Sequence, residues 1–445
     1  MFFFLTSIKE TLLCSKSLIL FTLFYTACVN HYHVKINLDS LNLLLKYLPF
    51  LSISVALLLV PKKRQRWVHF FNKNRGFVFL YFLYVAISFI SALFGQGLIL
   101  GLSKLVYFSV TSFCMTFLMY NVGYDSRSVN NLLNVFLVAG VLVSLAGIIT
   151  KYWSVDILLL SAYSSFSLEK EMFRTAGSLG NPVVYGSFLT MLVPFFLFKL
   201  IDCFKKMIFF FATCAGMLCV MCGIVISGSR MPIMLMFFSF IVMFFIFLRI
   251  KPVLTLFLFT LMLLLSLILS VDYTNSYIEA YKYDTVTDHI FERFNISNIS
   301  TGLDLRLNRY LLTWEVFKEH PLLGIGFGNF TSVFEQYQGE WLKDEGPKTI
   351  DNQFLMLVVE TGLLGLISFI TVLLSILSAC IFLFKYTYNS YVSDQMLSYS
   401  FLLFTISVLG LMMTWDTLNH PSIRIYFWAI VGLILSKKSM CTKNV

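Results

Sequence analysis

The sequence predicts an all-α protein that crosses a membrane many times, and its composition and apolar runs carry this prediction. Of the 445 residues, 58% are hydrophobic and only 13% are charged, whereas about 25% of the residues of a soluble domain are charged. Apolar runs of roughly 20 residues, the length that spans a bilayer as a helix, are spread along nearly the whole chain. We therefore expect one membrane domain over residues 1–445.

The apolar runs predict about twelve transmembrane helices. They cover 12–29, 42–60, 77–94, 98–120, 129–149, 183–200, 207–227, 231–248, 252–271, 352–384, 396–415 and 422–436. The run at 12–29 has no small-residue cleavage site and is expected to be the first span rather than a signal peptide. Basic residues at 62–66 follow the second span, so that loop is expected in the cytoplasm. Alternation of the spans then places both termini in the cytoplasm.

Two long segments fall on the outer side in this topology, residues 151–182 and residues 272–350. Function is expected there, because a membrane scaffold presents its chemistry through loops. The larger loop contains a predicted amphipathic helix from Gly302 to His320, whose apolar stripe is expected on the bilayer surface or against other helices. The stripe consists of Leu303, Leu307, Leu311, Trp314 and Phe317. The glycine cluster at 324–328 is interpreted as a tight turn, since it lacks the context of a phosphate-binding loop.

Two arginines at the outer boundary are candidates for an anion site. Arg174 stands shortly before Asn181 and Pro182 at the start of one span, and Arg230 opens another. A guanidinium is permanently charged and offers paired donors that fit phosphate oxygens. For each arginine alone, anchoring to lipid headgroups is the more common explanation, but together, beside Gly-rich and Asn-Pro segments, the two favour an anion site.

Two acids are candidates for proton transfer. Asp351 precedes Asn352 at the start of a span, where it would serve as a helix N-cap, as a general base, or as both. Glu360 lies about nine residues into that run, where a carboxylate is costly and usually faces a cavity. Gly362 and Gly365 would permit a bend there. Lys104, within another span, remains unassigned.

Taken together, these segments resemble the superfamily of O-antigen ligases and Wzy-type polysaccharide polymerases. The resemblance covers roughly residues 170–370. It rests on Arg174 to Pro182, Gly228 to Arg230, Arg306 to Trp314, His320 to Phe330, and Asp351 to Gly365.

The resemblance implies an inverting, metal-independent glycosyltransferase without a cofactor, with a GT-C-like fold in a bacterial plasma (inner) membrane. Its donor would be an oligosaccharide on undecaprenyl diphosphate, and its active site would lie on the outer face. Arg174 and Arg230 would hold the diphosphate, and Asp351 or Glu360 would be the base. The candidate substrate-binding residues are Arg306, Arg309, Asn181 and Asn352.

One departure separates the two branches of the superfamily. Ligases typically carry a histidine at the position of Asp351, whereas Asp-Asn is more like the polymerases. We therefore expect a polymerase that transfers a growing glycan to the non-reducing end of another lipid-linked repeat unit. The alternatives are a ligase that uses another acceptor and a transporter of lipid-linked polysaccharide. The expected partners are lipid-linked sugars and membrane lipid, and not nucleic acid; a chain-length regulator is left open.

Overall fold

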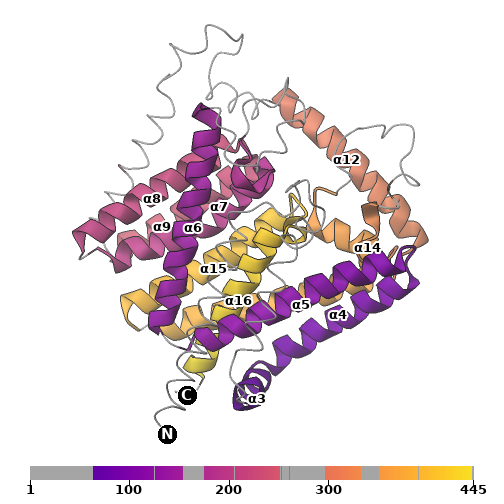
Figure 1. Ribbon diagram of the computed structural model, residues 1–445, viewed down its shortest axis with the longest axis horizontal. Coiled ribbons are helices and arrows are strands. Elements are labelled where there is room, and N and C mark those ends of the chain that lie inside the picture. The colour runs from indigo at the N-terminus through magenta and orange to yellow at the C-terminus, as the bar shows by residue number, and fades with distance from the viewer. Residues whose placement is uncertain are drawn as a thin grey trace, which may run out of the picture. The chain divides into compact units, whose positions relative to one another are not determined.

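The computed structural model describes residues 64–124, 126–153, 175–204, 206–250, 252, 260, 296–331, 334, 350–388 and 390–442. Within these residues the regular structure is entirely helical (Figure 1). Eight of the described helices are long and apolar enough to cross a membrane. The prediction of an all-α polytopic membrane protein is therefore confirmed. The count of twelve spans and the GT-C-like arrangement stay predictions.

Each of the eight helices coincides with a predicted span. They are α4 (Arg75–Phe94), α5 (Leu98–Val122), α6 (Ser126–Trp153), α7 (Pro182–Asp202), α8 (Met207–Ile226), α9 (Arg230–Ile250), α14 (Gln353–Thr387) and α15 (Val392–Met412). The predicted span at 422–436 is also a helix, α16 (Pro421–Cys441), which has charged residues near both ends. The predicted spans at 12–29 and 42–60, and nearly all of the one at 252–271, lie outside the described residues.

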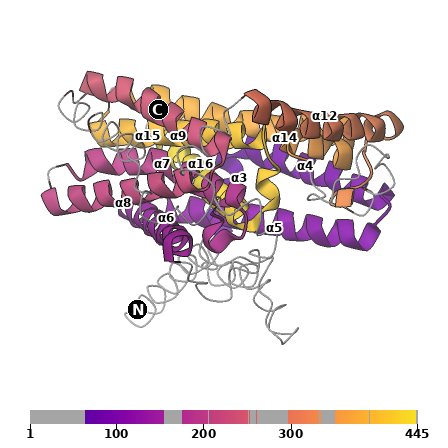
Figure 2. The ribbon, with the colours of Figure 1, turned by 90° about the horizontal axis from the view of Figure 1, so that it is seen from above.

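The chain divides into two compact units, and the first contains the described parts of 36–136 and 306–445. Its core is a set of packed helices in which α16 lies along α5, and α14 lies against α4, α15 and α16. Helix α16 is buried almost from end to end, and most of its buried side chains are aromatic or aliphatic. The short helix α3 (Arg64–Lys73) packs against α4 and α5. Figure 2 shows α4 and α5 from a second direction.

Helix α14 is broken at Gly362, whose φ of 65° and ψ of −167° are not helical. Backbone groups released by the break bond instead to the glycine-rich turn. The amides of Ile325 and Gly326 donate to the carbonyls of Val359 and Glu360, at 2.9 and 3.0 Å. Beyond the break, the amides at 363 and 364 donate to the carbonyls at 321 and 322. The predicted bend is confirmed, and the turn satisfies the polar groups that the bend exposes.

The second unit contains the described parts of residues 137–305. Helix α7 is its centre: every residue of the membrane-length window is buried, and the helix packs against α8 and α9. Asn181 caps α7 by accepting bonds from the amides of Val183 and Val184, and Pro182 occupies the first turn. This is the arrangement expected for an Asn-Pro pair at a helix start. The short helix η1 (Gly177–Leu179) leads into it.

Candidate functional site

In the first unit, polar residues gather around the start of α14. Asn352 is the N-cap, since its side chain accepts bonds from the amides of Phe354 and Leu355 at 2.9 and 3.2 Å. The interpretation of Asp351 as the cap was therefore wrong by one residue. Asp351 instead forms an ion pair of 2.6 Å with Arg309 of α12 (Ile296–Glu319). Both side chains are largely buried, so the contact fixes the loop helix against the start of α14.

Glu360 is 7% exposed and lies two residues before the break in α14. Its carboxylate accepts a bond of 3.4 Å from the amide of Phe330, and the backbone of Gly328 also bonds to it. Its own carbonyl accepts a bond of 2.7 Å from the hydroxyl of Ser91. Glu360 therefore holds the glycine-rich turn in place, whatever else it does.

The glycine-rich turn is the tight turn that the sequence predicts. Gly324, Gly326 and Gly328 have φ values of 66°, 103° and 72°, which L-residues rarely adopt. Lys104, unassigned from the sequence, donates a bond of 2.5 Å to the carbonyl of Gly328. The partly buried lysine thus reaches the turn from α5. Most of the backbone amides of the turn are engaged within the protein, and this favours a structural turn over a phosphate loop.

The connection between α15 and α16 joins this cluster, and the sequence did not predict it as part of a site. Asn352 donates a bond of 3.1 Å to the carbonyl of Met413, and Gln353 accepts one of 2.8 Å from the amide of Leu418. These bonds bring two buried charges to the start of α14, Asp416 and Arg424. The available signal was a pair of opposite charges beside an apolar run in a sequence that is poor in charge.

In the second unit, the two segments proposed to bind an anion lie together. Arg230 is the first residue of α9. The hydroxyl of Ser229 donates a bond of 3.2 Å to the carbonyl of Pro182, at the start of α7. The amide of Thr175 donates one of 3.1 Å to the carbonyl of Ile226. Arg174 lies outside the described residues, but its neighbour Thr175 is fixed next to the loop that leads to Arg230.

Two further candidate residues, Asn181 and Arg306, lie at the start of α7 and in α12. Asn181 is the cap of α7, and Arg306 lies in α12 with its side chain outside the described part. Helix α12 buries Leu312 and Val316 in a core cluster with the turn and α14. The predicted stripe faces away from that cluster: Leu307, Leu311 and Trp314 are each more than half exposed. The helix is confirmed, but a second apolar face, not the predicted one, packs against the described protein.

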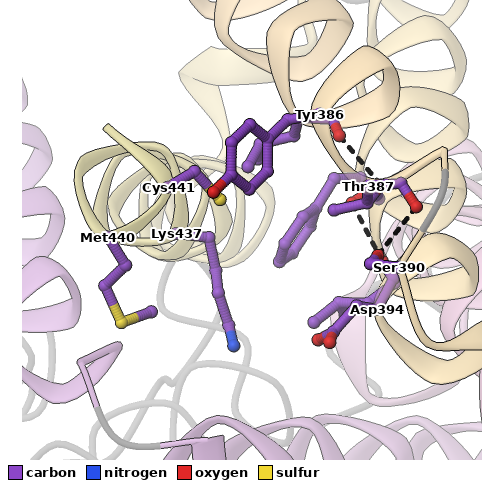
Figure 3. A pocket seen from close by; sticks show the side chains of 11 residues that line it. Tyr386, Thr387, Ser390, Asp394, Lys437, Met440 and Cys441 are labelled. Atoms are coloured by element: carbon purple, nitrogen blue, oxygen red, sulfur yellow. Dashed lines mark hydrogen bonds between the residues drawn. The ribbon is translucent and has the colours of Figure 1, made fainter. Parts of the chain in front are cut away.

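A cavity of about 250 Å³ lies between α14, α15 and α16 and contains none of the predicted residues (Figure 3). It is lined by Thr387 at the end of α14, Asp394 at the start of α15 and Lys437 near the end of α16. The candidate acids lie at the opposite end of α14. The cavity is therefore separate from the polar cluster.

The comparisons with known proteins bear on this cluster. Residues 215–370 match the family described as O-Antigen ligase. The matched segment contains Arg230, Arg309, Asp351 and Glu360, but not Arg174 or Asn181. No curated protein sequence matches the chain. The match shows that this segment of a multi-pass membrane protein is similar to the O-antigen ligase family.

Proposed function

We propose that the chain is a polysaccharide polymerase of the outer face of a bacterial plasma membrane. It transfers a growing glycan from undecaprenyl diphosphate to the non-reducing sugar of another lipid-linked repeat unit, with inversion and without a metal. Enzymes of the ligase and polymerase superfamily, which the family match supports, carry out glycosyl transfer of this kind. Asp351, in the position where ligases typically have histidine, favours the polymerase branch.

The observation that carries the proposal is the pairing of the starts of α7 and α9 in the second unit. Ser229 bonds to Pro182, and Thr175 bonds to Ile226, so the two arginine-bearing segments are adjacent. The N-terminus of a helix carries partial positive charge and attracts anions. Arg230 adds a full charge at one of these termini. This is chemistry suited to a diphosphate, with Arg174 as the second arginine.

The negative charge that develops on the leaving diphosphate gives these arginines a catalytic role. As the bond between the anomeric carbon and the diphosphate oxygen breaks, negative charge builds on the leaving diphosphate. Fixed cations stabilise that charge more in the transition state than in the bound substrate. Arg306, Arg309, Asn181 and Asn352 complete the substrate-binding set. The proton of the attacking hydroxyl goes to a carboxylate base, for which the sequence offers Asp351 and Glu360 as candidates.

The test is reconstitution of the purified protein with one lipid-linked repeat unit. A ladder of products on a gel is expected, and Arg230→Ala should reduce it by about 10²–10³-fold, as for loss of one transition-state donor. The matched control is Arg75→Ala. Arg75 is likewise the first residue of a helix, α4, but lies near the basic loop predicted in the cytoplasm.

Each other product has a defined meaning. Single transfer to an added acceptor, without a ladder, would indicate a ligase. Appearance of lipid-linked sugar across the bilayer, without any new glycosidic bond, would indicate a transporter. A full ladder from both Arg174→Ala and Arg230→Ala would reject the assigned diphosphate site while leaving the polymerase standing.

A further inference from the structure

Two buried charges in the first unit have unfilled hydrogen-bonding capacity. Arg424, in the first turns of α16, is 4% exposed. Its Nε and Nη2 atoms have no hydrogen-bond partner among the residues that the structure describes. Asp416, directly before η3 (Thr417–Asn419), is 2% exposed, and its Oδ1 atom also lacks a partner within that part of the chain. A buried group left in this state is costly, which calls for a ligand.

The two side chains are held in place by their other contacts. The Asp416 Oδ2 atom accepts a bond of 2.8 Å from the Nδ2 atom of Asn419. The guanidinium carbon of Arg424 lies 4.9 Å from the ring centre of Tyr107 and 5.2 Å from that of Phe108. These aromatic contacts stabilise a cation, but they leave its N–H groups to bond with something else.

The charges are close enough to interact but do not form an ion pair. No ion pair of 4.0 Å or less joins Arg424 to a carboxylate among the described residues. The positive charge of Arg424 nevertheless lowers the pKa of Asp416, against the larger raising effect of burial. The carboxylate of Asp416 and the guanidinium of Arg424 therefore lie near each other, with no direct hydrogen bond between them.

The chemistry of this pair selects the class of ligand. A phosphate would accept from Arg424, but it would be repelled by Asp416. An ammonium group would donate to Asp416, but it would be repelled by Arg424. A hydroxyl both donates and accepts, so it can donate to the Oδ1 atom of Asp416 and accept from Arg424 at the same time. Sugars are rich in such groups.

The position of the pair supports this selection. Asn352 and Gln353, next to Asp351, bond to residues 413 and 418 on the connection that carries Asp416. The pair therefore lies beside the predicted site residues at the start of α14. The two predicted acids are already engaged, Asp351 with Arg309 and Glu360 with the glycine-rich turn.

We propose that Asp416 and Arg424 form the subsite for the attacking hydroxyl of the acceptor sugar, with the Oδ1 atom of Asp416 as the proton acceptor. This inference rests on the proposed glycosyl transfer and assigns its base to Asp416, with Asp351 and Glu360 as positioning residues. The hydroxyl oxygen bonds to the anomeric carbon as its proton passes to Asp416. The bond from that carbon to the diphosphate oxygen breaks, and the electron pair leaves with the diphosphate.

The ionisation of Asp416 agrees with this role. Burial raises the pKa of Asp416 to about 7, while the bond from Asn419, the charge of Arg424 and a bond from the side chain of Gln353 oppose that rise. A base is most effective when its pKa lies near the working pH. The other titratable or charged groups that interact with it are Tyr84 of α4, Lys104 of α5 and Glu360 of α14.

The experiment supplies the donor and the acceptor as two different molecules, so that each can be varied alone. The donor is a lipid-linked repeat unit with its acceptor hydroxyl chemically blocked, and the acceptor is the repeat-unit oligosaccharide freed from its lipid. Asp416→Asn should lower kcat by about 10²–10⁴-fold, the usual contribution of a general base. Arg424→Lys should raise KM for the acceptor about 10–100-fold with donor binding unchanged, because a charge-assisted hydrogen bond is lost. Asp394→Asn is the control, since this acid lies at the other end of α15 and is exposed.

The pH profile tests the assignment of the base. Wild-type turnover should fall as the pH drops below about 7 and Asp416 becomes protonated, and this limb should vanish in Asp416→Asn. Unchanged kcat and KM in both single variants would show that the pair holds a buried water only. An unchanged acidic limb in Asp416→Asn would also overturn the assignment.

Failure of the proposed function has a different signature. If the wild-type protein transfers glycan to no sugar, the proposed glycosyl transfer fails, and the subsite is then tested by calorimetry with the free oligosaccharide. The double variant Asp416→Asn/Arg424→Gln removes both charges together, so that neither charge remains unpaired in the core. Binding to the wild type but not to this variant supports the subsite; equal binding or equal lack of binding rejects it.

Discussion

The break in α14 should be intolerant of any side chain at Gly362. Its φ of 65° and ψ of −167° fall in a region that only glycine adopts readily. A Cβ atom added there would lie 2.2 Å from the carbonyl carbon and oxygen of Leu322 and 2.5 Å from the amide nitrogen of Leu323. These are backbone atoms, so the clash cannot be relieved by rotating a side chain.

The expected cost of Gly362→Ala follows from the strain and from the bonds across the break. Backbone strain of this kind costs about 1–3 kcal/mol. Four backbone bonds join the turn to α14, with donors at Ile325, Gly326, Leu363 and Leu364. Each contributes about 0.5–1.5 kcal/mol, so displacing all four costs about 2–6 kcal/mol more. The sum is a large part of the about 5–15 kcal/mol that stabilises a typical domain.

The assay is thermal unfolding of the purified protein in detergent, followed by intrinsic fluorescence, with glycan transfer measured alongside. The control is Gly76→Ala in α4, where an added Cβ meets nothing within 4 Å. That substitution should be neutral, or stabilising by up to about 1 kcal/mol. Equal unfolding midpoints for Gly362→Ala, Gly76→Ala and the wild type would refute the account of the broken helix.

Three further predictions concern the charges of the first unit. A double-mutant cycle with Arg309→Ala and Asp351→Asn should give a coupling of about 1–3 kcal/mol, because the pair is short and largely buried; strict additivity would contradict this. Lys104→Met should lose about 1–3 kcal/mol, since it leaves the Gly328 carbonyl without that donor, and an unchanged melting midpoint would argue against the contact. Asp416→Asn should become more stable relative to the wild type as the pH rises from about 4 to 7, by at most about 4 kcal/mol. The sign follows because the raised pKa lets the native state of the wild type hold a proton that the unfolded state releases; a flat difference across this range would be evidence against the shift.

The helices could be predicted from the sequence because their signal is local. Long apolar runs separated by short polar segments set each boundary to within a few residues, and eight predicted spans coincide with described helices. The bend at Gly362 could also be predicted from the sequence, since two nearby glycines beside a buried acid weaken a helix at that point. The cap was harder to place, because Asp351 and Asn352 are both good capping residues and only the geometry distinguishes them.

The polar cluster could be predicted only in part, because long-range bonds assemble it. Asp416 lies far along the chain from Asp351, and the bonds from Asn352 and Gln353 that join the two segments leave no trace in local periodicity. The packing face of α12 could not be predicted for a related reason. This helix has two apolar faces, and periodicity does not reveal which of them the protein covers.

The most direct test of the proposed polymerase is the stoichiometry of lipid release. The purified protein is supplied with one lipid-linked repeat unit, and free undecaprenyl diphosphate is measured together with the number of new glycosidic bonds. Transfer from the lipid diphosphate predicts one lipid released for each bond formed, with both lost together in Arg230→Ala. Release of lipid without new bonds, or a growing ladder without release, would contradict the account.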